Sequence, residues 1–225
     1  MSALTIVFDL DGTLIDTAPD LAETLNVILD REGLAPVPYD KARAMIGFGA
    51  RHMIEAALAL ERRMASAAEV DRMFHDFIAH YAAHVADRSQ PFPGLTAALD
   101  HLAAQGFILA VCTNKLEGLS HLLLDALKLT PRFASICGQD TFGIQKPDPE
   151  VLRRTIAQAG GTTARAIMVG DSATDINTAK AAGIPVIAVD FGYTDIPVTE
   201  LGPDRVISHY RELADAVAGL TGRKP

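Results

Sequence analysis

The chain has 225 residues, of which 49% are hydrophobic and 21% charged, and 20 Lys and Arg against 28 Asp and Glu give a net charge of −8. This acidic balance disfavours nucleic acid and anionic membrane as partners, because both require clustered basic residues. No secretory signal is evident at the N-terminus, and no apolar run approaches the about 20 residues that span a bilayer. Cys112 and Cys137 fall within predicted strands, which favours reduced core residues in a cytoplasmic protein.

The first predicted element is a buried strand at Leu4–Phe8, a short run of apolar, β-branched and aromatic residues. It ends at Asp9, and Asp11 follows two positions later on the same side of an extended backbone. Two carboxylates this close repel one another unless a cation lies between them, and Mg²⁺ prefers oxygen ligands. The pattern therefore predicts a Mg²⁺ site at the end of this strand, in preference to a simple acidic turn.

Consecutive helices follow, with no strand between them. Thr17–Asp20 has the pattern of a capping box with a proline in the first turn, and apolar residues at helical spacing continue from it until Gly33. Further helices are predicted at 40–46, at 50–64 and from Ser66 onward. We interpret residues 17–88 as a helical domain inserted after the first strand.

From the proline-rich return at Ser89–Gly94, helices and strands alternate. The predicted helices are 95–104, 117–127, 149–159, 174–182 and 210–220, and the predicted strands are 107–112, 134–137, 166–169, 185–189 and 206–207. Near-continuous apolar strands between helices indicate a parallel sheet that is covered on both faces. We therefore predict an α/β fold in which residues 1–16 and 89–225 form the core.

In such a sheet, ligands bind outside the carboxyl ends of the strands. The polar residues predicted at that edge are Asp9, Asp11, Thr113, Asn114, Lys146, Asp171, Ser172 and Asp175. Taken singly, Thr113-Asn114 is typical of a helix cap and Lys146 of a solvated lysine before a turn. Their joint occurrence at strand ends instead predicts one site that combines carboxylates, a hydroxyl and an ammonium.

These motifs resemble those of the haloacid dehalogenase superfamily of phosphotransferases. The first signature is matched by Asp9-Leu10-Asp11-Gly12-Thr13-Leu14, and the later ones by Thr113, by Lys146-Pro147 and by Gly170-Asp171-Ser172-Ala173-Thr174-Asp175. The resemblance covers the whole chain. It implies a Rossmann-like catalytic core with an inserted helical cap.

The resemblance, together with the chemistry of the residues, implies a Mg²⁺-dependent phosphatase. Asp9 is the predicted nucleophile, which forms an aspartyl phosphate, and Asp11 the predicted general acid and base. The expected Mg²⁺ ligands are Asp9, the backbone carbonyl of Asp11, and Asp171.

The remaining motif residues are expected around the phosphoryl group. Lys146 and Thr113 are predicted to contact its oxygens. Ser172 and Asp175 are predicted to have supporting roles. Asp175 is expected to orient Lys146 or a metal-bound water.

Several related activities are disfavoured. The superfamily's dehalogenases lack the second aspartate, here Asp11, and its phosphonate hydrolases carry a lysine in the cap loop that residues 47–51 do not have. Its sugar phosphomutases use a cap histidine, and residues 17–32 contain none. A receiver-type signalling domain is the alternative from another class, although receivers have roughly half this length and carry the phosphorylated Asp on a middle strand.

For the substrate, the cap segment Gly47-Phe48-Gly49 and the nearby Arg51 are predicted to face the core, with Asn114 on the core side. Arg51 could receive a carboxylate in a bidentate pair, or it could be a surface residue. The chain is most similar to the phosphoglycolate phosphatases in its cap and in residues 175–183. We therefore expect a small phosphorylated metabolite, 2-phosphoglycolate, with sugar phosphates or nucleotides as alternatives, and a monomer or homodimer.

Overall fold

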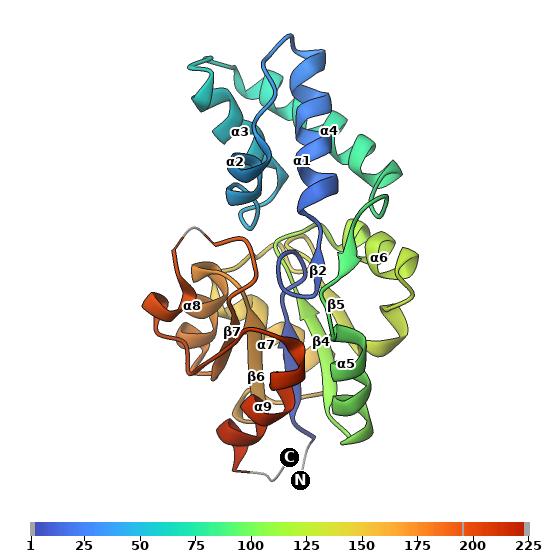
Figure 1. Ribbon diagram of the computed structural model, residues 1–225, viewed down its shortest axis with the longest axis vertical. Coiled ribbons are helices and arrows are strands. Elements are labelled where there is room, and N and C mark those ends of the chain that lie inside the picture. Colours follow the sequence, from blue (N-terminus) through green and yellow to red (C-terminus); the bar gives the residue numbers. More distant parts are fainter. Residues whose placement is uncertain (1–2, 195, 223–225) are drawn as a thin grey trace.

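The computed structural model describes residues 3–194 and 196–222, and its centre is one six-stranded parallel sheet (Figure 1). The strands are β1 (Thr5–Phe8), β4 (Ile108–Cys112), β5 (Ser135–Cys137), β6 (Ala166–Gly170), β7 (Val186–Val189) and β8 (Arg205–Ile207). Their order is β5-β4-β1-β6-β7-β8, so the strand order reverses on either side of β1. Ligands of such sheets bind at this reversal, beyond the carboxyl ends of the strands.

Helices cover both faces of the sheet, because side chains on successive strand positions point to opposite sides. These helices are α5 (Leu95–Ala104), α6 (Glu117–Ala126), α7 (Pro149–Gln158), α8 (Ala173–Ala182) and α9 (Leu213–Thr221). Val7 packs in one apolar core with α7 and α8, and its neighbours Ile6 and Phe8 pack in another with α5, α6 and α9. The predicted α/β class is confirmed. Cys112 and Cys137 are buried free thiols on neighbouring strands.

The remaining helices form a separate block above the carboxyl edge of the sheet (Figure 1). They are α1 (Ala18–Arg31), α2 (Tyr39–Ala44), α3 (Ala50–Leu60) and α4 (Ala67–Ala83). Helix α3 stops four residues before its predicted end, and Arg62, with a φ of 52°, has left the helical conformation. Among the described helices, none is both long and apolar enough to cross a membrane.

This arrangement agrees with the division into a core and a cap, and the boundaries at residues 16–17 and 88–89 stay an interpretation. The termini of the proposed core, residues 1–2 and 223–225, and residue 195 within it lie outside the described part of the chain.

The predicted capping box at Thr17–Asp20 is wrong, because both side chains have partners elsewhere. Thr17 Oγ1 donates to Asp11 Oδ1 at 2.7 Å. The Asp20 carboxylate accepts from the amides of Arg88, at 3.0 Å, and Ser89, at 2.8 Å. These two residues therefore connect α1 to the core and to the returning chain instead of capping their own helix.

The two connections between cap and core are paired with each other. Strand β2 (Ile15–Asp16) runs antiparallel to β3 (Gln90–Pro91) in a two-stranded sheet that the sequence pattern did not predict. The Tyr193 hydroxyl accepts from the amide of Thr17 at 2.6 Å and donates to Asp16 Oδ1 at 2.7 Å. The outgoing and returning segments thus form one ordered, paired connection that is anchored to the core.

Candidate active site

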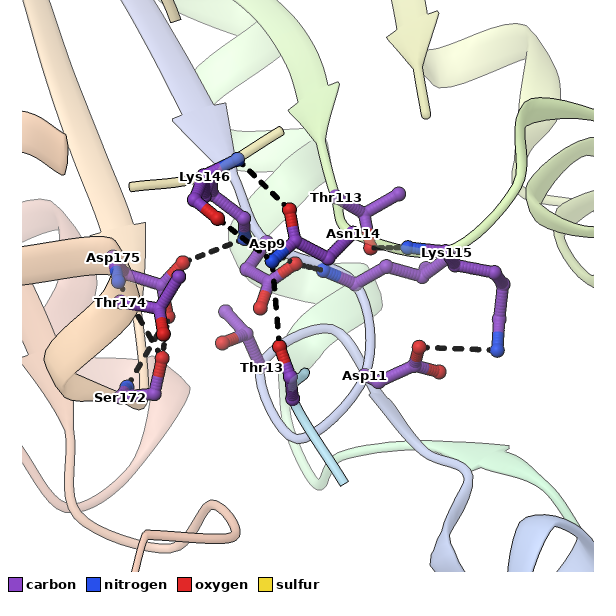
Figure 2. A network of polar contacts seen from close by, with 12 residues as sticks. Asp9, Asp11, Thr13, Thr113, Asn114, Lys115, Lys146, Ser172, Thr174 and Asp175 are labelled. Atoms are coloured by element: carbon purple, nitrogen blue, oxygen red, sulfur yellow. Dashed lines mark hydrogen bonds and ion pairs between the residues drawn. The ribbon is translucent and has the colours of Figure 1, made fainter. Parts of the chain in front are cut away.

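Three neighbouring strands deliver the central residues of the site. Asp9 follows β1, Thr113 follows β4 and Asp171 follows β6, and Phe8 is in register with both Val111 and Val169. Since the three strands are parallel, their carboxyl ends meet at one edge, where all three polar side chains are buried. Figure 2 shows Asp9 and Thr113 at this edge.

Asp9 is held by one buried ammonium. Its Oδ1 accepts from the amide of Leu10 at 2.7 Å and lies 2.8 Å from Lys146 Nζ. The same ammonium donates to Asp175 Oδ1 at 2.6 Å, and the Lys146 side chain is only 2% exposed. Burial alone would lower the pKa of Lys146, but the carboxylates of Asp175 and Asp9 raise it above its usual value. Lys146 is therefore a fixed positive charge next to Asp9.

Asp175 is fully engaged in organising its neighbours. While Oδ1 accepts from Lys146, Oδ2 accepts from the Ser172 hydroxyl at 2.7 Å and from the amide of Asp171 at 3.2 Å. Ser172 in turn caps α8, since its Oγ accepts from the amide of Asp175 at 3.4 Å. The position of Lys146 is thus coupled to the start of α8.

Asp171 is fixed by the first loop and by the segment after β7. Its Oδ1 accepts from Thr13 Oγ1 at 3.0 Å, and its Oδ2 accepts from the amide of Tyr193 at 2.7 Å. Gly12 approaches it so closely that an added Cβ would lie 2.5 Å from Asp171 Oδ2, and its φ is +81°. The turn after Asp11 therefore requires glycine at this position.

A metal ion fits this cluster. Carboxylate oxygens of Asp9, Asp171 and Asp175 lie within 4.8 Å of one another, and all three residues are buried. Burial and the charge of Asp175 raise the pKa of Asp9 to about 7 and that of Asp171 to about 8. A divalent cation would relieve this repulsion. Asp175 accepts from Lys146 and Ser172, and the choice of Asp9 and Asp171 as the side-chain ligands stays a prediction.

The Asp11 side chain lies apart from this cluster. Its Oδ1 accepts from Thr17 Oγ1 at 2.7 Å, and its Oδ2 lies 3.0 Å from the ammonium of Lys115. Sequence reasoning missed Lys115, although it directly follows the Thr113-Asn114 motif. The site therefore has two buried lysines, Lys146 near Asp9 and Lys115 near Asp11, on opposite sides in Figure 2.

Thr113 and Asn114 stabilise the loops around the site. Thr113 Oγ1 accepts from the amide of Lys115 at 3.1 Å. Asn114 exchanges two hydrogen bonds with the backbone of Lys146, at 2.9 and 3.1 Å, and its Nδ2 lies 3.5 Å from the carbonyl of Gly47 in the cap. Neither residue caps α6, whose N-cap is Leu116. The side chain of Asn114 thus positions the Lys146 loop.

A cavity lies between the cap and the core, with about 40 Å³ available to the centres of water-sized groups. Its polar lining comes from the core: Asp9, Asp11, Thr113, Asn114, Lys115 and Gln139. The cap contributes mostly apolar residues, including Leu21, Ile46, Met53, Phe74, Phe77, Ile78 and Tyr81. The cavity is therefore small, charged on the side of the core and apolar on the side of the cap.

Of the four cap residues predicted to bind substrate, only two line this cavity. Gly47 and Gly49 line it, whereas Phe48 does not and is 58% exposed. Arg51 is also outside the lining, because its Nη2 pairs with Asp71 Oδ1 at 2.6 Å and its guanidinium lies 5.1 Å from the Phe74 ring centre. The structure thus places Arg51 on the cap surface.

Comparisons with known proteins agree with this geometry. A family model described as "Haloacid dehalogenase-like hydrolase" matches residues 6–189. A protein named phosphoglycolate phosphatase from Mesorhizobium japonicum is 52% identical over 97% of this chain and 96% of its own length. One from Agrobacterium fabrum is 48% identical over 94% of this chain and 91% of its own.

A solved structure has the same architecture over nearly its full length. The crystal structure of a predicted phosphoglycolate phosphatase from Haemophilus somnus matches with a TM-score of 0.89 and 28% identity, over 96% of this chain and 98% of that one. The family match spans the helical block as well as most of the sheet, which a receiver domain would not explain. The chain therefore belongs to the haloacid dehalogenase-like hydrolases and is similar to phosphoglycolate phosphatases, which are phosphoric monoester hydrolases.

Proposed function

We propose that this hydrolase cleaves 2-phosphoglycolate through an aspartyl phosphate on Asp9. The observation that carries the proposal is the arrangement of two carboxylates with different surroundings. Asp9 is buried beside Lys146, and Asp11 faces the cavity on the other side of the site. Such a pair suits a nucleophile and a general acid.

The first step forms a bond between Asp9 and phosphorus. Within the described residues, the amide of Leu10 and the ammonium of Lys146 both engage Oδ1 of Asp9, which leaves Oδ2 to attack. As the Oδ2–P bond forms, the bond between phosphorus and the ester oxygen breaks, and Asp11 gives its proton to that oxygen. The ammonium of Lys146 stabilises the charge that develops on the phosphoryl oxygens.

The second step releases phosphate. Asp11, now ionised, takes a proton from a water molecule as that water attacks phosphorus, and the bond between phosphorus and Asp9 breaks. Asp9 and Asp11 are thereby returned to their starting states. The products are inorganic phosphate and the alcohol.

A Mg²⁺ ion would be held by the side chains of Asp9 and Asp171 and by the backbone carbonyl of Asp11. When bound, it would supply the positive charge that lets an anionic nucleophile approach a phosphate dianion. The raised pKa values of Asp9 and Asp171 support this assignment, because burial and the neighbouring Asp175 disfavour the ionised carboxylates that a cation would stabilise.

The substrate assignment is supported by the names of the relatives and by the size of the cavity. Both relatives named above are called phosphoglycolate phosphatase and match over nearly the whole chain. A chamber with about 40 Å³ for water-sized centres suits a leaving group of a few non-hydrogen atoms.

The test is a time course of phosphate release from 2-phosphoglycolate, a hexose phosphate and a nucleotide, with Mg²⁺ or with excess EDTA. We expect steady turnover, the highest kcat/KM for phosphoglycolate, and loss of activity in EDTA. Asp9→Asn should lower kcat by several orders of magnitude, because no neighbouring group replaces the nucleophile. A higher kcat/KM for the hexose phosphate would refute the substrate, and substantial activity of Asp9→Asn would refute the covalent mechanism.

A further inference from the structure

The mechanism above gives no task to Lys115, although this lysine is buried in the active site. Lys115 follows Asn114, just after the end of β4, and its side chain is 5% exposed. Its ammonium lies 3.0 Å from Asp11 Oδ2 and 4.5 Å from the centre of the Tyr81 ring in the cap. Lysine is rarely buried without compensating partners, so its position in the cavity needs an explanation.

The partners that the structure shows do not saturate this ammonium. In the part of the chain that the structure describes, Asp11 is the only carboxylate within 4 Å of Lys115 Nζ. An ammonium has three N–H donors, and the Tyr81 ring offers only the attraction of its face. Lys115 can therefore accept a second anion while it keeps its contact with Asp11.

The lining of the cavity points to where that anion would come from. Lys115 is the only Lys or Arg among the described residues that line it, since Lys146 is enclosed between Asp9 and Asp175. Lys146 lies near Asp9 and Lys115 near Asp11 (Figure 2). In the proposed mechanism, Asp9 attacks phosphorus and Asp11 protonates the leaving oxygen. The ammonium of Lys115 thus lies on the side of the leaving group.

We propose that Lys115 binds the carboxylate of the leaving group and sets the specificity for phosphoglycolate. The inference rests on the proposed function. In phosphoglycolate the carboxylate carbon is two bonds from the ester oxygen, so a substrate poised for protonation by Asp11 brings its carboxylate next to Asp11. Once Asp11 has given its proton to the ester oxygen, its carboxylate and that of the leaving group repel each other unless a cation lies between them, and the ammonium of Lys115 lies 3.0 Å from Asp11 Oδ2.

Two further features support this role for Lys115. Arg51, the other candidate from the sequence, is paired with Asp71 on the cap surface, and its side chain is 45% exposed. The Tyr81 hydroxyl is buried and has no hydrogen-bond partner among the described residues. Tyr81 comes from the cap, and its ring, 4.5 Å from the ammonium, limits the positions that Lys115 can adopt.

The test compares 2-phosphoglycolate with ethyl phosphate, which has the same two carbons but no carboxylate. Lys115→Met removes the charge and keeps most of the side-chain volume. It should lower kcat/KM for phosphoglycolate about 10- to 100-fold more than for ethyl phosphate, as expected for the loss of one hydrogen bond to a charged group. Lys115→Arg should retain most of the preference. Lys41→Met, which changes an exposed lysine of the cap, is the matched control.

A binding measurement separates recognition from an effect on Asp11. In the Asp9→Asn background, calorimetry should show weaker binding of phosphoglycolate after Lys115→Met and little change for ethyl phosphate. If only kcat falls and binding is unchanged, Lys115 merely positions Asp11 and the inference is wrong. Lys115→Gln provides a second neutral variant should Lys115→Met fail to fold.

Failure of the inference can be told apart from failure of the proposed function. If the wild-type enzyme does not prefer phosphoglycolate to ethyl phosphate, the proposed substrate is wrong. If the wild type shows the preference, Lys115→Met keeps it and Arg51→Met loses it, the substrate stands and the carboxylate is bound by Arg51 instead of Lys115.

Discussion

Burial of Asp9 and Asp171 opposes the ionisation that catalysis requires. Burial and the neighbouring Asp175 raise their pKa values from 3.8 to about 7 and about 8. Between the unfolded pKa of 3.8 and the folded values of about 7 and about 8, the folded protein binds more protons than the unfolded chain. The free energy of unfolding therefore falls as the pH rises through this range. The contribution of the two groups to the free energy of unfolding is fully present below about pH 4, and it is lost as the pH rises through 7 to 8.

We therefore predict a pH-dependent stability that Mg²⁺ reverses. In EDTA, the Tm of the wild-type protein should fall by several degrees between pH 5.5 and 8.5. Mg²⁺ should raise the Tm most at the high end, because it binds the ionised carboxylates. Thermal unfolding followed by circular dichroism measures both effects. Asp171→Asn removes one of the groups and should flatten the pH dependence in EDTA, and an identical slope in this variant would contradict the assignment.

The residues of the motifs could be predicted from the sequence because a parallel sheet fixes where strand ends lie. Asp9, Thr113 and Asp171 meet because their strands are neighbours in register. Lys115 and Arg51 could not be placed in this way. Each has a long side chain with several rotatable bonds, and its direction depends on partners distant in sequence, Asp11 at 3.0 Å for Lys115 and Asp71 at 2.6 Å for Arg51.

At the scale of elements, the paired connection between cap and core is held by the Asp20 carboxylate at the start of α1. This group is 3% exposed and accepts from the amides of Arg88 and Ser89 and from the Ser89 hydroxyl, at 2.6 to 3.0 Å. It thereby joins the first cap helix to the chain that returns to the core. Pairing of β2 with β3 and the Asp20 contacts join the outgoing and returning connections, which the sequence pattern did not indicate.

Asp20→Ala should reduce the free energy of unfolding by about 2–3 kcal/mol, because it leaves buried donors without an acceptor. Asp20→Asn, which keeps one acceptor oxygen, should lose less. Urea denaturation followed by circular dichroism gives both values. Glu23→Ala is the control, because Glu23 is exposed and its ion pair with Arg88 Nη2 is long, at 3.7 Å. This substitution should change the free energy of unfolding by about 0.5 kcal/mol or less. Equal effects of the two alanine variants would contradict this role for Asp20.

At the scale of the whole molecule, the structure shows the cap in contact with the core. The guanidinium of Arg43 in α2 donates to the carbonyls of Phe191, at 3.2 Å, and Gly192, at 2.5 Å, directly before Tyr193, whose amide binds Asp171. Strand order and this docking could not be predicted from periodicity, because neither leaves a local pattern in the sequence. The Arg43 contacts connect the cap to the loop that fixes a proposed metal ligand.

If closure accompanies binding, the radius of gyration should decrease when a phosphoryl analogue fills the site. We expect small-angle scattering to show this compaction on addition of Mg²⁺ with tetrafluoroberyllate. Arg43→Ala removes the two bonds to the core carbonyls, so the unliganded variant should be more open than the wild type and its KM for phosphoglycolate should rise. Lys41→Ala on the same helix, at an exposed position, should leave both quantities unchanged. A radius of gyration that is the same with and without the analogue, in the wild type and in Arg43→Ala, would mean that the cap is fixed over the core and that substrate enters without a hinge motion.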